Sequence, residues 1–375
     1  MKVLISGGGT GGHIFPAVSI ANALRGIDPS CEIIFVGAEG RMEMERVPQA
    51  GYQIIGLPVR GLDRKRPWRN IRVAIDFVRS MCKVRRIIRE FRPDVGVGVG
   101  GYASGAAMKV AAKMGVPILL QEQNGFAGVT NKMLKKDAAK ICVAYEGMER
   151  FFPADKLILT GNPVRQNLKE GNKVDAIEYF NQTFGVNFSA DRKTLLIIGG
   201  SLGARTINDS IKTHLQELID SGIQVVWQTG KYYFEECKQA LSAIVGTNKN
   251  AANNLIICTD FISQMPQAYA LADLVISRAG ASSISELCLL GKASVLVPSP
   301  NVAEDHQTHN AMALVRRDAA VLVKDIEAGS KMVETALELL TNNDKLKSLE
   351  RNILTLALPD SANIIANEVI KLAKK

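Results

Sequence analysis

Short apolar runs alternate with helix-length amphipathic stretches along most of the chain, and this alternation predicts a parallel α/β architecture. In the first half, the runs expected to form buried strands are residues 3–5, 33–36, 94–98, 117–120, 141–143 and 157–159. Helices are expected from about Pro16 to Leu24 and at residues 68–91, 106–114 and 129–136. Strand, helix and strand in this order are typical of βαβ units.

The second half restarts this pattern after a polar, irregular stretch that follows Arg165. Its strands are expected at residues 195–198, 225–228, 255–258, 274–277, 294–297 and 320–323, and its helices at 232–244, 265–272, 283–290 and 306–317. The tail from residue 345 is helical in pattern and is divided by Pro359. We predict two doubly wound domains, residues 1–162 and 163–340, with helices of residues 341–375 packing back on the first. Such twin domains bind ligands between the carboxyl ends of their sheets, so loops of both are expected in one cleft.

Composition fits a soluble globular protein: of 375 residues, 47% are hydrophobic and 22% are charged. No run approaches the ~20 continuous apolar residues of a membrane span. The chain begins with Met1 and a strand, without a leader pattern, so a cytoplasmic protein is expected. The six cysteines are scattered without a C-x-x-C pair, which argues against a zinc site and a disulfide framework. We interpret them as small buried apolar residues.

The positive charge is concentrated in one segment. The chain carries a net charge of +9, and residues 57–92 alone contain twelve Lys or Arg against three acids. The rest of the chain is therefore balanced. The segment includes the predicted helix 68–91, in which apolar residues recur at helical spacing.

Glycine-rich turns follow several predicted strands. The first, residues 7–13, holds five glycines and ends in His13. Glycine lets the backbone turn sharply and approach a ligand, and a following helix start offers unpaired N–H groups, so this turn suits a phosphate or diphosphate. His13 adds a side chain that titrates near neutrality and can act as a base. A purely structural turn is the alternative. Similar turns stand at residues 98–105 and 199–204.

Two polar stretches of the second half allow two interpretations each. In residues 276–286, Ser283 and Glu286 have the spacing of a capping box. Alternatively, the small residues 280–282 leave a helix start open to a phosphate, and Glu286 takes both hydroxyls of a ribose. The run 304–310 could bind the hydroxyls of a sugar or form an ordinary solvated helix start.

Several kinds of site are not indicated. The chain has no Asp-x-Asp pair, no G-x-x-x-x-G-K-[ST] loop and no His-rich metal spacing. Phosphate charge is therefore expected to be met by backbone amides, helix ends and an arginine such as Arg165.

A set of short motifs between about residues 2 and 340 occurs in a specific order. The motifs are 7–16, 100–102, 122–124, 161–165, 199–204, 261–265, 278–286 and 306–311. Together they resemble the MurG family of bacterial N-acetylglucosaminyltransferases, which act in peptidoglycan synthesis. The ordered set is far more specific than any one loop.

This resemblance implies a GT-B glycosyltransferase that moves N-acetylglucosamine from UDP-GlcNAc to the C4 hydroxyl of the muramoyl sugar of lipid I, undecaprenyl-diphosphoryl-MurNAc-pentapeptide. The products are lipid II and UDP, and the α-linked donor becomes a β-linkage in one inverting displacement. No tightly bound cofactor and no structural metal are implied. The protein would act peripherally at the cytoplasmic face of the inner membrane, with other cell-wall synthesis and division proteins as partners.

The resemblance also implies roles for individual residues. On the donor side these are Phe261, Ile262 and Met265 at the uracil, Ser282 and Ser283 at the diphosphate, Glu286 at the ribose, Ala281, His306 and Gln307 at the sugar, and Arg165 and Ser201 near the phosphates. From the first domain, Thr10, Gly11, Gly12 and Asn124 would close over the donor, and Gly8, Gly9, Gly101 and Tyr102 would line the acceptor.

The attacking alcohol must lose a proton, so a general base is required. His13 is the leading candidate, Glu122 is the rival, and both could instead position substrate. The family usually shows His-Glu-Gln-Asn where this chain begins with Gln121, which puts a role for an imidazole there in doubt.

The basic segment then gains an interpretation as a membrane-docking surface, because lipid I lies in an anionic membrane. The helix would bind the membrane by shallow insertion of its apolar residues and by charge attraction, which contributes about 1 kcal/mol of binding free energy per basic residue. The residues concerned are Arg72, Ile75, Phe77, Val78, Arg79, Met81, Lys83 and Arg86. A core-packed helix with a solvated basic face is the alternative. Nucleic acid binding is disfavoured because interleaved aromatic residues are missing.

Three other functions remain as rivals. Another UDP-sugar enzyme of GT-B fold, such as a glycolipid synthase or a UDP-GlcNAc epimerase, is the nearest. An NAD-dependent oxidoreductase is disfavoured because residues 35–37 end the second strand without a ribose-binding acid. A noncatalytic, membrane-associated binding module is the third.

Overall fold

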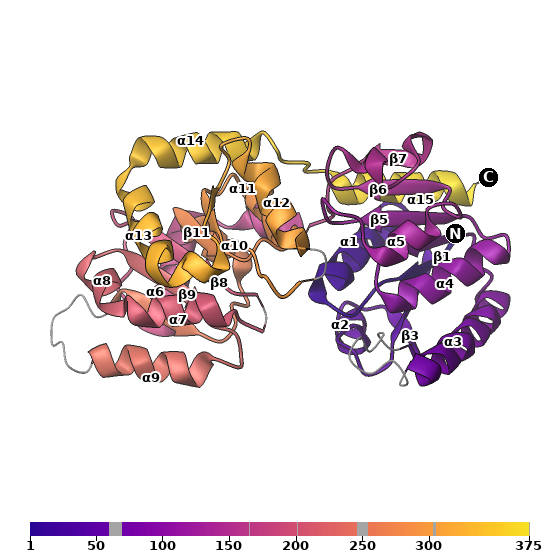
Figure 1. Cartoon of the computed structure of the whole chain (residues 1–375), viewed down its shortest axis with the longest axis horizontal. Coiled ribbons are helices and arrows are strands. Elements are labelled where there is room, and N and C mark those ends of the chain that lie inside the picture. The colour runs from indigo at the N-terminus through magenta and orange to yellow at the C-terminus, as the bar shows by residue number, and fades with distance from the viewer. Residues whose placement is uncertain (60–69, 165, 201, 246–253, 303–304, 375) are drawn as a thin grey trace. The chain divides into compact units, whose positions relative to one another are not determined.

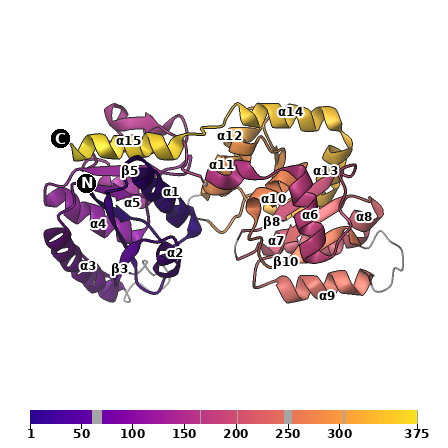
Figure 2. The same cartoon turned by 180° about the vertical axis from the view of Figure 1, so that it is seen from behind.

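The computed structural model describes residues 1–59, 70–164, 166–200, 202–245, 254–302 and 305–374 (Figure 1). The chain divides into two compact units, one of Met1–Arg165 with Leu358–Lys375 and one of Gln166–Ala357. The carboxyl-terminal helices, expected to return together to the first domain, are divided between the units. Helix α14 (Asn343–Leu354) packs on helices of the second unit, whereas α15 (Ser361–Ala373) packs on α1 (Gly11–Ile27) of the first (Figures 1 and 2).

The described part of the first unit contains a seven-stranded, fully parallel sheet in the order β3-β2-β1-β4-β5-β6-β7. Its strands are β1 Lys2–Ser6, β2 Glu32–Ala38, β3 Gln53–Leu57, β4 Val95–Gly98, β5 Ile118–Glu122, β6 Lys140–Val143 and β7 Leu157–Leu159. Its remaining helices are α2 Glu43–Gln49, α3 Asn70–Phe91, α4 Tyr102–Lys113 and α5 Val129–Leu134, with 3₁₀ turns η2 Met148–Arg150 and η3 Ala154–Lys156.

Helices cover both faces of this sheet because successive strand residues point to opposite sides. In β1, Leu4 belongs to the core shared with α3 and α4, while Val3 and Ile5 belong to the core shared with α1 and α15. Strand order reverses between β1 and β4, and Ser6 pairs in register with Gly98. The glycine-rich loops that follow β1 and β4 therefore leave the sheet side by side. This is the switch point of the strand order, where doubly wound sheets bind ligands.

The second unit repeats the arrangement with six parallel strands among its described residues, in the order β10-β9-β8-β11-β12-β13. They are β8 Thr194–Ile198, β9 Gln224–Gln228, β10 Ile256–Thr259, β11 Leu274–Ser277, β12 Ser294–Leu296 and β13 Val321–Leu322. The helices are α6 Lys173–Phe184, α7 Arg205–Thr213, α8 Leu215–Asp220, α9 Phe234–Val245, α10 Met265–Leu271, α11 Ala281–Leu290, α12 His306–Val315 and α13 Ala328–Thr341, with 3₁₀ turns η4 Gln166–Glu170 and η7 Asp325–Glu327.

The two faces of the second sheet carry different helices. Core residues of α6, α10, α11 and α12 share one face, and those of α7, α8, α9 and α13 share the other, while α14 contributes core residues to both. Figure 2 is viewed from the side on which α6 and α10 lie in front. The predicted pair of doubly wound parallel sheets is confirmed. No helix in the described ranges is both long and apolar enough to cross a membrane.

Some local predictions are wrong for identifiable reasons. Helix α1 begins at Gly11 rather than near Pro16, because the Thr10 carbonyl already accepts from the amides of His13 and Ile14. The stretch after Arg165, expected to be irregular, contains α6. Asn172 caps that helix by accepting from the Asp175 amide at 2.9 Å.

The interpretation of all six cysteines as buried is also incorrect, because Cys82 is exposed and Cys258 is partly exposed. Burial raises the pKa of the Cys142, Cys258 and Cys288 thiols to about 12. These three thiols are therefore protonated, unreactive groups at neutral pH.

Candidate active site

The first glycine loop joins β1 to α1, and the buried carboxylate of Glu43 holds it by a hydrogen bond. The Gly9 amide donates to Glu43 Oε2 at 2.9 Å, and the Ala38 amide donates to Glu43 Oε1 at 2.9 Å. Glu43 has no exposed surface. Sequence reasoning missed this residue, because it stands in a charged segment that looks like an ordinary surface helix.

His13 lies in the first turn of α1, and its Nδ1 is 3.0 Å from the Gly8 carbonyl oxygen. A carbonyl can only accept, so this hydrogen bond requires a proton on Nδ1, and in the neutral ring the lone pair is then on Nε2. The imidazole is thus oriented by the backbone of the loop in which the sequence placed it.

The second glycine loop packs tightly on the first. Gly100 and Gly101 have φ of 102° and 89°, which favour glycine. A Cβ at Gly101 would lie 2.5 Å from the Gly8 carbonyl oxygen, and one at Gly100 would lie 2.9 Å from His13 Nε2. The structure therefore brings His13, Gly8 and Gly101 together. Tyr102 begins α4 beside them and is 58% exposed.

The start of α1 retains features of an anion site. Thr10 precedes the helix in an extended conformation without making a side-chain cap, and the first turn contains no acid. The amides of Gly11 and Gly12 therefore stand at a positive helix end. The loop is only partly available to an anion, however, because Glu43 already accepts from Gly9.

Glu122, the rival base, is 1% exposed at the end of β5. Its carboxylate accepts from the Gly128 amide at 2.9 Å, Asn131 Nδ2 at 3.0 Å, and the amide and Nδ2 of Asn124 at 3.2 and 3.4 Å. Burial raises the pKa of the Glu122 carboxyl, and these hydrogen bonds act in the opposite direction. This geometry favours a role in holding the loop of residues 124–128. Asn131 was not identified from the sequence.

Gln121 takes part in a buried amide network and is not exposed. Its Nε2 donates to Asn162 Oδ1 at 3.0 Å, and its Oε1 accepts from Gln123. Gln123 Nε2 also donates to the Val99 carbonyl at 2.8 Å, which links β5 to the second glycine loop. A neutral histidine offers one donor and one acceptor and could make the same links as Gln121. The position therefore connects loops, and no reacting imidazole is required there.

In the second unit, α11 begins at Ala281 and its N-cap is Gly280, which cannot make a side-chain cap. Ser283 lies inside the first turn, so the capping-box interpretation of Ser283 and Glu286 is wrong. The helix start carries only small residues, and Ser282 and Ser283 are partly exposed. This end of α11 has the form of a phosphate site.

Glu286 is held by a buried tyrosine that sequence reasoning did not identify. The hydroxyl of Tyr269 donates to Glu286 Oε2 at 2.9 Å, and Tyr269 is 2% exposed. Glu286 itself is partly exposed. One carboxylate oxygen is therefore fixed from the protein side, which orients the group.

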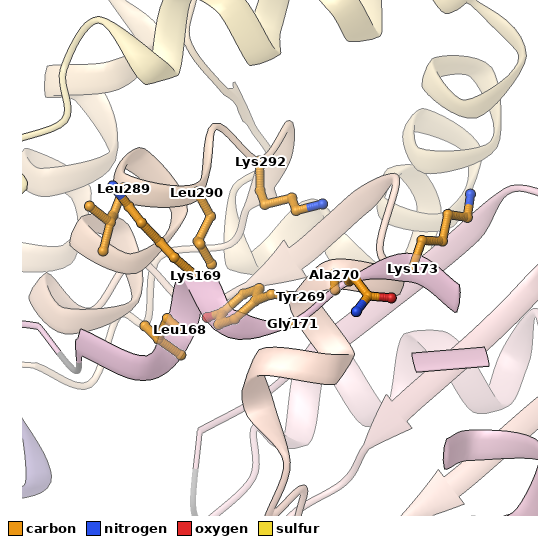
Figure 3. A pocket seen from close by; sticks show the side chains of 10 residues that line it. Leu168, Lys169, Gly171, Lys173, Tyr269, Ala270, Leu289, Leu290 and Lys292 are labelled. Carbon is orange, nitrogen blue, oxygen red and sulfur yellow. The ribbon is translucent and has the colours of Figure 1, made fainter. Parts of the chain in front are cut away.

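Tyr269 also lines a pocket of about 350 Å³ in the second unit (Figure 3). The other lining residues are Leu168, Lys169, Gly171, Asn172, Lys173, Ala270, Leu289, Leu290 and Lys292. Lys292 donates to the Ala272 carbonyl at 2.8 Å, and burial lowers the pKa of its amine. Apart from Tyr269, none of the lining residues contacts a predicted site residue through a described hydrogen bond.

The polar run at the start of α12 ties neighbouring loops together. Gln307 Oε1 accepts from the Ser299 amide at 2.9 Å, and Asn310 Nδ2 donates to the Ala279 carbonyl at 3.3 Å. Asn310 is fully buried, so this is more than a solvated helix start. His306 is partly exposed in the first turn of the helix.

Arg278 fixes the carboxyl ends of three strands. Its guanidinium donates to Asp325 and to the carbonyl of Val297 at 3.0 Å. Asp325 Oδ2 accepts from Thr206 Oγ1 at 3.0 Å. Arg278 therefore belongs to the framework beneath the loops.

The remaining predicted donor residues differ in exposure. Phe261 is 54% exposed, whereas Ile262 and Met265 are 4% and 7% exposed and belong to the core. Arg165 and Ser201 lie outside the described residues. Among those described, no three His, Cys, Asp or Glu side chains gather as metal ligands would.

On α3, apolar and basic side chains share an exposed face. Ile75 and Val78 are 49% and 59% exposed, and Cys82 follows one turn later and is also exposed. Arg79, Lys83 and Arg86 are exposed as well. Met81 packs against the core, and Phe77, 40% exposed, lies on another side of the helix. The side chain of Arg72 is outside the description.

Lys83 and Arg86 each have an acidic neighbour. Lys83 pairs with Glu39 at 3.1 Å and Arg86 with Glu90 at 2.7 Å. The buried side of α3 is formed instead by residues such as Val84, Ile87 and Ile88. The exposed stripe is therefore separate from the core-facing one.

Both units match one family of enzymes. Residues 3–143 match the glycosyltransferase family 28 N-terminal domain, and residues 194–365 match the glycosyltransferase family 28 C-terminal domain.

Close relatives span the whole chain. A protein of Bacteroides fragilis is 59% identical over 378 residues, covering 100% of this chain and 96% of the relative. A protein of Cytophaga hutchinsonii is 50% identical over 373 residues, covering 99% and 96%. Both carry the name UDP-N-acetylglucosamine–N-acetylmuramyl-(pentapeptide) pyrophosphoryl-undecaprenol N-acetylglucosamine transferase.

Solved structures agree in fold. MurG of Acinetobacter baumannii is similar with a TM-score of 0.77 and 26% identity, covering 99% of both chains. The UDP-GlcNAc 2-epimerase of Neisseria meningitidis, bound to UDP-GlcNAc, gives a TM-score of 0.68 at 15% identity, covering 99% of this chain and 100% of that one. The second similarity shows the fold alone.

Proposed function

This chain belongs to glycosyltransferase family 28, and from that premise we propose that it transfers N-acetylglucosamine from UDP-GlcNAc to the C4 hydroxyl of the muramoyl sugar of undecaprenyl-diphosphoryl-MurNAc-pentapeptide. Its two parallel-sheet units form a GT-B fold. The observation that carries the proposal is 59% identity along the entire chain to a transferase of this name. The epimerase alternative rests on a likeness in fold at 15% identity.

In this reaction the acceptor oxygen forms a bond to the anomeric carbon while the bond to UDP breaks. The acceptor proton must leave, and His13 is the base that the geometry supports. Its Nδ1 bond to the Gly8 carbonyl directs the Nε2 lone pair away from that backbone. Glu122 is less suited to this task, because it is buried and accepts from Gly128, Asn131 and Asn124.

The second unit supplies groups for the departing UDP. The open start of α11 would stabilise the diphosphate through backbone amides, and Glu286 would accept from the ribose hydroxyls. Gln307 and His306 stand at the start of α12 for the sugar. Exposed Phe261 is the aromatic surface available to the uracil.

The decisive experiment measures UDP release from UDP-GlcNAc with and without a soluble lipid I analogue. We expect UDP only when the acceptor is present, together with a β-linked disaccharide product. The variant His13→Ala should abolish turnover while retaining UDP-GlcNAc binding by calorimetry. Formation of an epimerised sugar without acceptor would instead support the epimerase, and binding without any turnover in the wild type would support a noncatalytic module.

We further propose that the exposed α3 face docks on anionic membrane. The support is the exposure of Ile75 and Val78 beside basic Arg79 and Arg86 on one helix. Apolar side chains can enter the headgroup region while the cations meet lipid charge. The acceptor carries a lipid chain, so a peripheral position at the cytoplasmic membrane surface agrees with the proposed reaction.

Vesicle binding tests this docking surface. Replacing Arg79, Lys83 and Arg86 by Glu should weaken binding to phosphatidylglycerol vesicles by at least about 3 kcal/mol, from about 1 kcal/mol per lost cation. Activity on a soluble acceptor should be unchanged. The matched control replaces Lys345, Lys347 and Arg351 of α14 by Glu, an equal charge change elsewhere. Equal losses of binding in the two triple variants, or a parallel loss of soluble activity, would contradict the proposal.

A further inference from the structure

A single peptide group lies between the buried carboxylate of Glu43 and the imidazole of His13. The group is the bond between Gly8 and Gly9. Its N–H, on Gly9, donates to Glu43 Oε2 at 2.9 Å, and its C=O, on Gly8, meets His13 Nδ1 at 3.0 Å. Because a trans peptide is planar, its N–H and C=O point in opposite directions, so the carboxylate and the imidazole lie on opposite sides of it.

The surroundings are built to hold Glu43 in this place. A Cβ at Gly8 would lie 2.1 Å from Glu43 Oε1, and one at Gly37 would lie 2.6 Å from Glu43 Cγ. Glycine at both positions makes room for the side chain. The second carboxylate oxygen accepts from the Ala38 amide at 2.9 Å. A fully buried carboxylate requires such donors, because removing it from water is costly.

We propose that Glu43 is a positioning residue for the transferase reaction, acting on His13 through the Gly8–Gly9 peptide group. Only the expected effect of Glu43 on turnover rests on the proposed function. A hydrogen bond to a charged acceptor is strong and polarises the peptide, which makes the Gly8 oxygen a better acceptor. His13 is thereby held with its proton on Nδ1 and its lone pair on Nε2.

The proton balance follows from this arrangement. The C4 hydroxyl of the acceptor gives its proton to His13 Nε2 as its oxygen bonds to the anomeric carbon, and UDP leaves with the electron pair of the broken bond. The imidazolium so formed has Nδ1–H directed at the polarised Gly8 carbonyl. Glu43 takes no proton. Its part corresponds to that of a carboxylate that orients a catalytic histidine, with a peptide group inserted between the two.

The first test is spectroscopic and uses the wild-type chain without substrate. The chain has four histidines, so the ¹⁵N signals of His13 can be assigned by comparison with His13→Ala. The shifts should show Nδ1 protonated and Nε2 bearing the lone pair in the neutral ring. A neutral His13 that is mainly protonated on Nε2 would overturn the proposal, whatever the variants do.

The second test compares Glu43→Gln with Glu45→Gln. Glu45 lies on the same helix and is exposed, so its change is a matched control. Glutamine has one acceptor oxygen and cannot satisfy both amides, so the Nδ1–H form should be less dominant. We expect kcat to fall about 10- to 100-fold, as for other partners that orient a functional imidazole, with little change in KM for UDP-GlcNAc.

The outcomes separate the two proposals. A changed His13 spectrum in Glu43→Gln, with lower kcat and a native melting curve, supports the positioning role of Glu43. An unchanged spectrum, or a rise in KM with kcat preserved, overturns it. If the wild type releases no UDP with the acceptor, the proposed function fails. The tautomer of His13 and its response to Glu43→Gln still decide whether Glu43 positions the imidazole.

Discussion

Removing one hydroxyl should test the proposed ribose site. Tyr269→Phe deletes the donor to Glu286 Oε2 at 2.9 Å and keeps the buried ring. A hydrogen bond to a charged group contributes about 1.5–3 kcal/mol. Glu286 is partly exposed, so water replaces some of the loss and the lower end applies. Tyr269 fixes Glu286 before UDP binds, so the variant must order the carboxylate during binding, and we expect UDP binding to weaken by up to about 1.5 kcal/mol, which is roughly tenfold.

Isothermal titration calorimetry with two ligands makes this measurement specific. UDP has the two ribose hydroxyls that Glu286 is proposed to accept from, and 2′,3′-dideoxy-UDP lacks them. The variant should lose affinity for UDP but bind the dideoxy ligand as the wild type does, which is the logic of a double-mutant cycle. Tyr232→Phe is the control, because Tyr232 is 76% exposed. Equal losses for both ligands, or an unchanged affinity for UDP, would refute the reasoning.

Two further predictions concern stability. Burial raises the pKa of Glu122 above its ordinary 4.5, so the stability linked to its proton is present at low pH and is lost as pH rises through the raised pKa. In urea unfolding, the free energy of unfolding of Glu122→Gln should therefore rise relative to that of the wild type as pH increases from about 4 to about 8. The opposite trend would contradict this prediction. Arg278→Met leaves the Asp325 carboxylate without its ion pair. Because Asp325 is 19% exposed, the expected loss of stability is at the low end for a buried pair, about 3 kcal/mol. Adding Asp325→Leu should recover part of this loss, and no recovery would count against the ion pair.

Much of the fold is readable in the sequence because its strands are buried on both faces. Residues 195–198 form a continuous apolar run followed by small residues, and residues 274–276 form another apolar run before Ser277. Both runs lie in central parallel strands. The glycine loops could be located because each follows directly after such a run. The segment of α6 was missed, because only Ala176 and Phe180 of that helix are buried and its remaining residues are largely polar.

The site was only partly readable, because several of its residues act through distant contacts. His13 stands out by its place after the glycines, but Glu43 resembles its charged neighbours until folding buries it under residues 30 and more positions away. The signal that could have found it is the unusual glycine at position 37, which clears its place. Tyr269 likewise gains its meaning from Glu286, 17 residues later.

The return of α15 to the first unit has a consequence for how the protein is made. Core residues of α1 such as Ile14 share their cluster with Ile365 and Val369 of α15. On the ribosome, β7, the last strand of the first unit, emerges roughly 200 residues before this helix, a delay of about 10 to 40 seconds. During that interval one face of the first sheet lacks its last cover. Until α15 has been synthesised, an apolar surface of the first unit therefore stays exposed and can bind to other chains, and this period is when a chaperone would be needed most.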